Sequence, residues 1–173
     1  MDTKKLLACC GLITCMFSSQ PILASDECTI GDVSGWVHTT NLSNVLQSGV
    51  IKLVIEVDGE IYFKRKGVII GQITHQGFNE DGLPTASLEH DIFFGFGNRM
   101  ETFNDRAVLI PTKFENGIPC EFDVSEVISE AIGTKRLKHL SNDEHEIFAD
   151  GSVSFCSDKN KNKFELSGTV CIK

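Results

Sequence analysis

Residues 87–110 decide the fold, and they read Ser87-Leu-Glu-His-Asp-Ile-Phe-Phe-Gly-Phe-Gly-Asn-Arg-Met-Glu-Thr-Phe-Asn-Asp-Arg-Ala-Val-Leu-Ile110. In the first half every second residue shares one face of a strand, and that face is largely apolar. Its members are Leu88, His90, Ile92, Phe94 and Phe96. Gly97-Asn98 supplies a turn, and residues 99–110 return. The stretch therefore predicts an antiparallel hairpin with one buried face.

The register of this hairpin depends on the length of its turn. A two-residue turn closed by Phe96 and Arg99 fixes every cross-strand pair. The predicted pairs are Phe94 with Glu101, Ile92 with Phe103, His90 with Asp105, and Leu88 with Ala107. A slip of one residue would turn the whole set to the other face, so the prediction is sensitive to the turn.

Alternation with a period of two continues along most of the chain. Residues 51–57 and 61–63 flank Asp58-Gly59, a dipeptide that favours tight hairpins. Residues 149–156 and 163–171 resemble a closing pair of strands. About eight short strands with little helix predict an all-β fold, either a closed antiparallel barrel or a β-sandwich.

Two segments are less clearly patterned. Residues 120–132 fit a strand that curls into a helical turn, because both periods are present. Residues 26–48 are polar and weakly patterned, which leaves an extended N-terminal arm open. We expect a single domain over residues 26–173.

The N-terminus has the order of a secretory signal peptide. Lys4-Lys5 precedes a short apolar run, and small residues follow up to Ser25. We expect cleavage after Ala24 or Ser25 and a secreted or periplasmic protein. The alternative is a lipoprotein anchored through Cys9, but only a few apolar residues precede that cysteine.

Four of the seven cysteines lie beyond residue 25, namely Cys28, Cys120, Cys156 and Cys171. An even number in an exported chain predicts two disulfides. We expect Cys156 to pair with Cys171 across the terminal strands, and Cys28 to pair with Cys120. No cysteine or histidine pair has the spacing of a zinc site, so no metal site is predicted.

Composition and missing motifs narrow the function. Sixteen Lys and Arg against 24 Asp and Glu give a net charge of −8, which does not favour nucleic acid or insertion into an anionic membrane after cleavage. The chain lacks a nucleophile elbow, a Walker loop, a dinucleotide fingerprint and a His-Glu-x-x-His motif, so no cofactor is expected.

Several short stretches resemble uncharacterised secreted bacterial proteins similar to the allene oxide cyclase and dirigent barrels. Thr102-Phe-Asn-Asp-Arg-Ala-Val-Leu-Ile-Pro-Thr112 is similar to their T-x-D-R-x-V-L-x-P stretch, with Asn104 as one extra residue. Gly133-Thr-Lys-Arg-Leu137 resembles a turn of that family, and Ser167-Gly-Thr-Val-Cys171 resembles its ending. The resemblance implies an eight-stranded barrel with an apolar interior that often forms homo-oligomers. It carries over no functional residue.

Our first functional hypothesis is a small exported barrel that binds an apolar small molecule in its lumen or a protein partner at its rim. Ile92, Phe94, Phe96 and Phe103 would line the ligand site.

The alternative enzyme hypothesis is a cyclase or isomerase with His90, Asp105 and Glu101 as catalytic residues, because a carboxylate can orient a histidine base. An outward or rim position of that face would leave these residues merely solvated. A third hypothesis is a secreted inhibitor or effector that contacts its target through loops 77–84 and 157–163.

Overall fold

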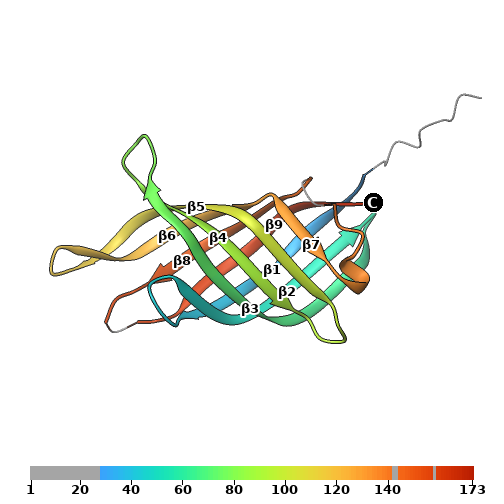
Figure 1. Cartoon of the computed structure of the whole chain (residues 1–173), viewed down its shortest axis with the longest axis horizontal. Helices are drawn as coiled ribbons and strands as arrows, with labels where there is room; N and C mark the ends of the chain where they lie inside the picture. The colour runs from blue at the N-terminus through green and yellow to red at the C-terminus, as the bar shows by residue number, and fades with distance from the viewer. Residues whose placement is uncertain (1–27, 142–143, 158) are drawn as a thin grey trace, which may run out of the picture.

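The computed structural model describes residues 28–141, 144–157 and 159–173. The predicted signal peptide, its predicted cleavage site and the alternative lipid anchor all fall outside these residues. The described residues form nine strands and one short 3-10 helix (Figure 1). They are β1 (Thr29–Asn41), β2 (Leu46–Val57), β3 (Glu60–Phe78), β4 (Pro84–Phe93), β5 (Arg99–Glu115), β6 (Ile118–Ile128), β7 (Glu130–Gly133), η1 (Lys135–Leu137), β8 (Glu146–Ser154) and β9 (Asn162–Ile172).

The sheet closes on itself. Its strands follow the order β4-β3-β2-β1-β9-β8-β6-β5, and β4 also pairs with β5. Every pairing is antiparallel, and β7 is an extra short strand beside the first residues of β5. The result is a closed antiparallel barrel of eight strands, as the alternation predicted, and the β-sandwich alternative is wrong. Closure leaves the principal strands without a free edge.

Inward-facing residues of the strands fill the barrel. Ile51, Leu53 and Ile55 of β2 are almost fully buried, as are Phe63 of β3 and Val170 of β9. The β-branched side chains at these positions suit a pleated, packed surface. Burial of this apolar layer is the main stabilising contribution to the fold.

The two ends of the barrel differ. η1 lies next to β7 at the end that carries the C-terminus (Figure 1), and Leu137 of η1 and Leu140 after it are buried. The Tyr62 hydroxyl donates to the Arg136 carbonyl oxygen at 2.7 Å and holds this segment in place. At the other end the β3–β4 and β5–β6 hairpins project past the barrel. Among the described residues, no helix has the length and apolar character that a membrane crossing needs.

The N-terminal segment is part of the barrel, so the predicted extended arm is wrong. β1 pairs with β2 from Asp32 to Asn41 and with β9 from Thr29 to Thr39. Asp32, Ser34 and His38 are exposed, while Val33, Val37 and Thr39 are buried. Residues 120–132, which fitted either a strand or a helical turn, form strands β6 and β7.

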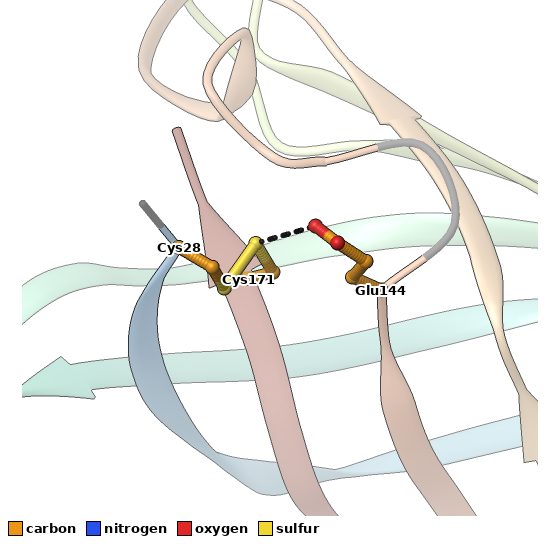
Figure 2. A group of neighbouring side chains, drawn as sticks. All are labelled: Cys28, Glu144 and Cys171. Atoms are coloured by element: carbon orange, nitrogen blue, oxygen red, sulfur yellow. Dashed lines mark hydrogen bonds between the residues drawn. A yellow bond between two sulfur atoms is a disulfide. The ribbon is translucent and has the colours of Figure 1, made fainter. Parts of the chain in front are cut away.

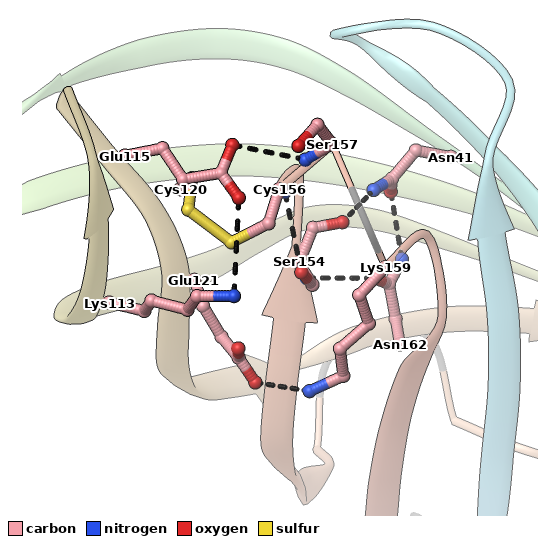
Figure 3. Close-up of a disulfide and its surroundings, with 10 residues drawn as sticks. All are labelled: Asn41, Lys113, Glu115, Cys120, Glu121, Ser154, Cys156, Ser157, Lys159 and Asn162. Atoms are coloured by element: carbon pink, nitrogen blue, oxygen red, sulfur yellow. Dashed lines mark hydrogen bonds and ion pairs between the residues drawn. A yellow bond between two sulfur atoms is a disulfide. The ribbon is translucent and has the colours of Figure 1, made fainter.

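Two disulfides are present, but the predicted pairing is wrong. Cys28 bonds Cys171, where the start of β1 meets the end of β9, and the Glu144 Oε2 lies 3.1 Å from the Cys171 sulfur (Figure 2). Cys120 of β6 bonds Cys156 (Figure 3). Cys156 follows the end of β8, and Cys171 lies near the end of β9. Because these strands are antiparallel, the two cysteines sit at opposite ends of the pair. Both disulfides are compatible with an oxidising, exported location.

We predict that proteolysis without reduction, followed by mass spectrometry, will recover peptides linked through Cys28–Cys171 and Cys120–Cys156. The double variant Cys120→Ser/Cys156→Ser should unfold at lower denaturant, losing about 2–5 kcal/mol of free energy of unfolding, because the unfolded chain gains freedom. Recovery of peptides joined through Cys28 and Cys120 would contradict the assignment.

Candidate functional site

The β4–β5 hairpin does not have its predicted register. Its loop spans residues 94–98, with the Phe94 amide donating to the Asn98 carbonyl oxygen at 2.9 Å. Gly95, Phe96 and Gly97 all have positive φ angles, a backbone path that a two-residue turn does not use. The observed pairs are Ile92 with Met100, Asp91 with Glu101, and His90 with Thr102.

A β-bulge at Asn104 nevertheless brings His90 and Asp105 together. Asn104 has φ 55°, and the register of β5 against β4 shifts at this point, so that Asp105 pairs with Leu88. One extra residue restores the inward direction of the side chains that follow. The His90 Nδ1 therefore lies 2.8 Å from the Asp105 Oδ2. The predicted contact is confirmed, although its predicted cause is wrong.

Four buried polar side chains form what we call the lumen cluster: His90, Thr102, Asp105 and Glu126. The Thr102 hydroxyl donates to the Asp105 Oδ2, the same oxygen that His90 contacts. Glu126 comes from β6, and its Oε1 lies 3.7 Å from the His90 Nδ1. Exposure is 7% or less for all four residues. The Asp105 Oδ1 and the Glu126 Oε1 are buried with no hydrogen-bond partner within the described part of the chain.

The pKa values of the three titratable groups of the lumen cluster are all raised, but not by the same cause. Burial raises the pKa of Glu126 from 4.5 to about 7 and raises the pKa of Asp105 above its ordinary value. For His90, burial alone would lower the pKa. The charge of Glu126, the hydrogen bond to Asp105 and the charge of Asp105 outweigh this effect, so the pKa of His90 is raised. Near neutral pH, Glu126 can donate or accept a proton.

Gly71 of β3 makes room for the imidazole ring. It pairs with His90, and a Cβ atom at this position would lie 2.8 Å from the His90 Cδ2 and 2.9 Å from its Nε2. That is closer than real Cβ atoms approach such neighbours, so a side chain here would displace the ring. The lack of a side chain at Gly71 is therefore part of the site.

The remaining predicted site residues divide between the interior and the surface. Glu101 lies outside the lumen cluster and forms an ion pair with Arg99 at 2.7 Å, so its predicted place in the lumen is wrong. Phe96 is 90% exposed in the hairpin loop, and Phe103 follows the inward-facing Thr102 on the other side of β5. Neither residue lines the interior. Ile92 and Phe94 are buried as predicted.

Sequence reasoning missed Glu126, Thr102 and Gly71. A signal for Glu126 existed, because Val124, Glu126 and Ile128 share the buried face of β6, and Glu126 is a charged residue in an apolar series. Thr102 was placed on the wrong face by the assumed register. Gly71 carried no signal, because its role depends on the position of His90 on the neighbouring strand.

Two small cavities lie inside the barrel on either side of Glu126. The first cavity has a volume of about 30 Å³ and is lined by His90 and by apolar residues such as Ile92. The second cavity has a volume of about 50 Å³. It lies toward the end at which the β3–β4 and β5–β6 hairpins project, which we call the open end. Gln47, Glu126 and Phe164 line both cavities and separate them. Each cavity has room for only a few water-sized groups, so the interior is largely packed.

A larger groove lies outside the second cavity, at the end where the two long hairpins project. Its volume is about 740 Å³, and its walls include Phe78, Ile118 and Phe122. The groove and the second cavity share four apolar lining residues, Ile73, Ala86, Leu109 and Phe155. The groove therefore adjoins the second cavity, whose lining includes Glu126, across a shared and largely apolar boundary that we call the neck.

Comparisons with protein-family models, curated proteins and solved structures found no match to this chain. The resemblance to allene oxide cyclase and dirigent barrels stays a prediction.

Stability should fall as pH rises through the range in which the lumen cluster titrates. Between about pH 4.5 and 7 the folded protein keeps a proton on Glu126 that the unfolded chain has lost, and the raised pKa values of His90 and Asp105 act in the same direction. We predict that Glu126→Gln removes most of a decline of up to about 3 kcal/mol. Urea unfolding at several pH values checks this. An equal decline in Glu126→Gln and the surface control Glu101→Gln would contradict it.

Proposed function

We propose that this protein is an exported binding protein that takes an apolar small molecule at the open end of its barrel. The observation that carries the proposal is the outer groove of about 740 Å³, which adjoins at the neck a second cavity lined in part by Glu126. Apolar concave sites with a few polar groups are the usual form of small-molecule sites. Export is supported by the N-terminal sequence pattern and by the two disulfides.

The volumes of the groove and of the second cavity favour an elongated ligand. A groove of about 740 Å³ is in the usual range for a bound small molecule, whereas the inner cavity of about 50 Å³ admits only a narrow end. In this arrangement the body of the ligand lies between the hairpins, and its tip passes Ala86 and Leu109. The neck, where Ala86 and Leu109 border both the groove and the second cavity, is narrow. A narrow boundary suits the tail of a small molecule better than the broad surface of a protein.

The exposed aromatic and aliphatic residues of the groove support the same proposal. Phe78 is 77% exposed and Ile118 is 69% exposed, although both border an apolar hollow. Contiguous exposed apolar surface on a soluble domain commonly marks a binding site. A ligand that covers these side chains would remove apolar area from water, which is the driving force for its binding.

Binding can be tested with the neutral apolar dye N-phenyl-1-naphthylamine and the chain from residue 26 onward, purified with its disulfides formed. We expect saturable fluorescence enhancement at micromolar concentrations. Ala86→Leu should fill the neck, and Phe155→Asp should place a charge beside it, so each should weaken binding by roughly tenfold or more.

Phe96→Asp is the matched control, because Phe96 is exposed in the loop at the other end of the barrel. It should bind the dye as the wild type does. The proposal is wrong if the wild type does not bind, or if both neck variants bind with unchanged affinity while retaining wild-type melting temperatures. A protein partner at the rim would then be the better hypothesis.

A second candidate is a proton-transfer enzyme, such as a cyclase or isomerase. The observation in its favour is the 2.8 Å contact between His90 and Asp105 in an apolar interior. Asp105 would orient His90 as the general base. Glu126, whose pKa is about 7, would be the acid in place of the predicted Glu101. The role of secreted inhibitor or effector stays a prediction.

For the enzyme candidate, His90→Gln should abolish any turnover of an apolar epoxide or enone that the wild type catalyses, because the amide cannot accept the proton. Product formation followed by mass spectrometry measures this. Turnover that survives in His90→Gln would exclude His90 as the base.

A further inference from the structure

The lumen cluster brings three metal-ligating side chains together from three strands. His90 lies on β4, Asp105 on β5 and Glu126 on β6, and one ligand atom of each lies within 4.8 Å of the other two. All three residues are buried. Sequence patterns did not reveal this group, because the place of Glu126 depends on the register of β6 against β5.

Two carboxylate oxygens of this group are buried without a hydrogen bond, although the Glu126 Oε1 lies 3.7 Å from the His90 Nδ1. The Asp105 Oδ1 and the Glu126 Oε1 are shielded from solvent and accept no hydrogen bond from the described residues. Buried polar oxygens are nearly always satisfied, because an unsatisfied one costs free energy. A cation between the two carboxylates would supply what both atoms lack.

We propose that His90, Asp105 and Glu126 bind a divalent transition-metal ion in the barrel lumen. The neutral imidazole and two carboxylates carry a charge of −2, which a divalent ion balances. The His90 Nδ1 lies 2.8 Å from the Asp105 Oδ2 and 3.7 Å from the Glu126 Oε1, separations that ligands around one ion can adopt with small shifts. On binding, the ion takes the place of the proton on the Nδ1.

The donor set indicates which ions fit. Imidazole with carboxylates suits zinc, cobalt, manganese or iron, whereas calcium and magnesium prefer sites made of oxygen alone. Thr102 would hold the Asp105 carboxylate in place as an outer partner. The adjacent cavity of about 30 Å³ has room for one or two waters to complete the coordination.

The other groups with suitable spacing do not compete. The described residues contain two, Cys28 with Glu144 and Cys171, and Cys120 with Glu115 and Cys156. In both groups the sulfurs are joined in disulfides, so no thiolate is free to bind an ion. The lumen cluster is therefore the stronger site.

The test is a titration of Co²⁺ into the untagged, disulfide-bonded protein after treatment with EDTA and dialysis. We expect visible absorption bands that saturate at one equivalent and disappear when Zn²⁺ is added, but persist in excess Ca²⁺. Glu126→Gln and Asp105→Asn should each weaken Co²⁺ binding by roughly tenfold or more, because even outer partners of metal sites have effects of that size.

Glu101→Gln is the matched control, since it removes a carboxylate from the same strand as Asp105 but outside the lumen cluster. It should bind Co²⁺ as the wild type does. Glu126→Gln keeps the shape of the side chain, and its melting temperature reports whether it folds. The proposal is overturned if the wild type shows no saturable binding at micromolar Co²⁺, or if folded Glu126→Gln binds with unchanged affinity. Neither result affects the dye experiment, so the two proposals fail separately.

Discussion

The pairing of β4 with β5 is the constraint on which the rest of the structure depends. The register of this pairing decides which side chains of the hairpin face into the barrel. Without the bulge at Asn104, residues after Thr102 would face the wrong way, and Asp105 would lie on the surface. With it, Asp105 and Ala107 both point inward and are buried. One residue in the sequence thus places a carboxylate in an apolar lumen.

The lumen cluster opposes the stability of the barrel that contains it. The surrounding positions are filled by apolar side chains such as Ile92 and Ile128, which gain by burial. Asp105 and Glu126 lose their hydration in the same space. Each has one carboxylate oxygen that accepts no hydrogen bond from the described residues. An apolar residue at position 126 would satisfy the fold better. A residue that departs from the pattern of its own strand often marks a functional site, and Glu126 is such a residue.

Much of the fold followed from local patterns, whereas the site depended on the register between neighbouring strands. Alternation predicted the strands, and the contact of His90 with Asp105 was found because both residues lie on one hairpin. The predicted register of the β4–β5 hairpin was wrong because loop 94–98 has a positive φ at Phe96. A phenylalanine in the sequence does not indicate that conformation. The disulfide prediction failed because Cys156 and Cys171 lie at opposite ends of the antiparallel β8–β9 pair. Glu126 was missed because the pattern of residues 120–132 did not reveal the register of β6 against β5.

The position of β1 has a consequence for the order of folding. β1 is the first strand of the barrel to be synthesised, yet one of its two neighbours is β9, the last. Until β9 has been made, β1 presents an unpaired edge that other chains could join. Contacts of such long sequence separation form slowly, because a large loop must close first. The bond between Cys28 and Cys171 spans 143 residues and lies at this seam. Its formation therefore stabilises the pairing of β1 with β9, which can form only after both strands have been synthesised.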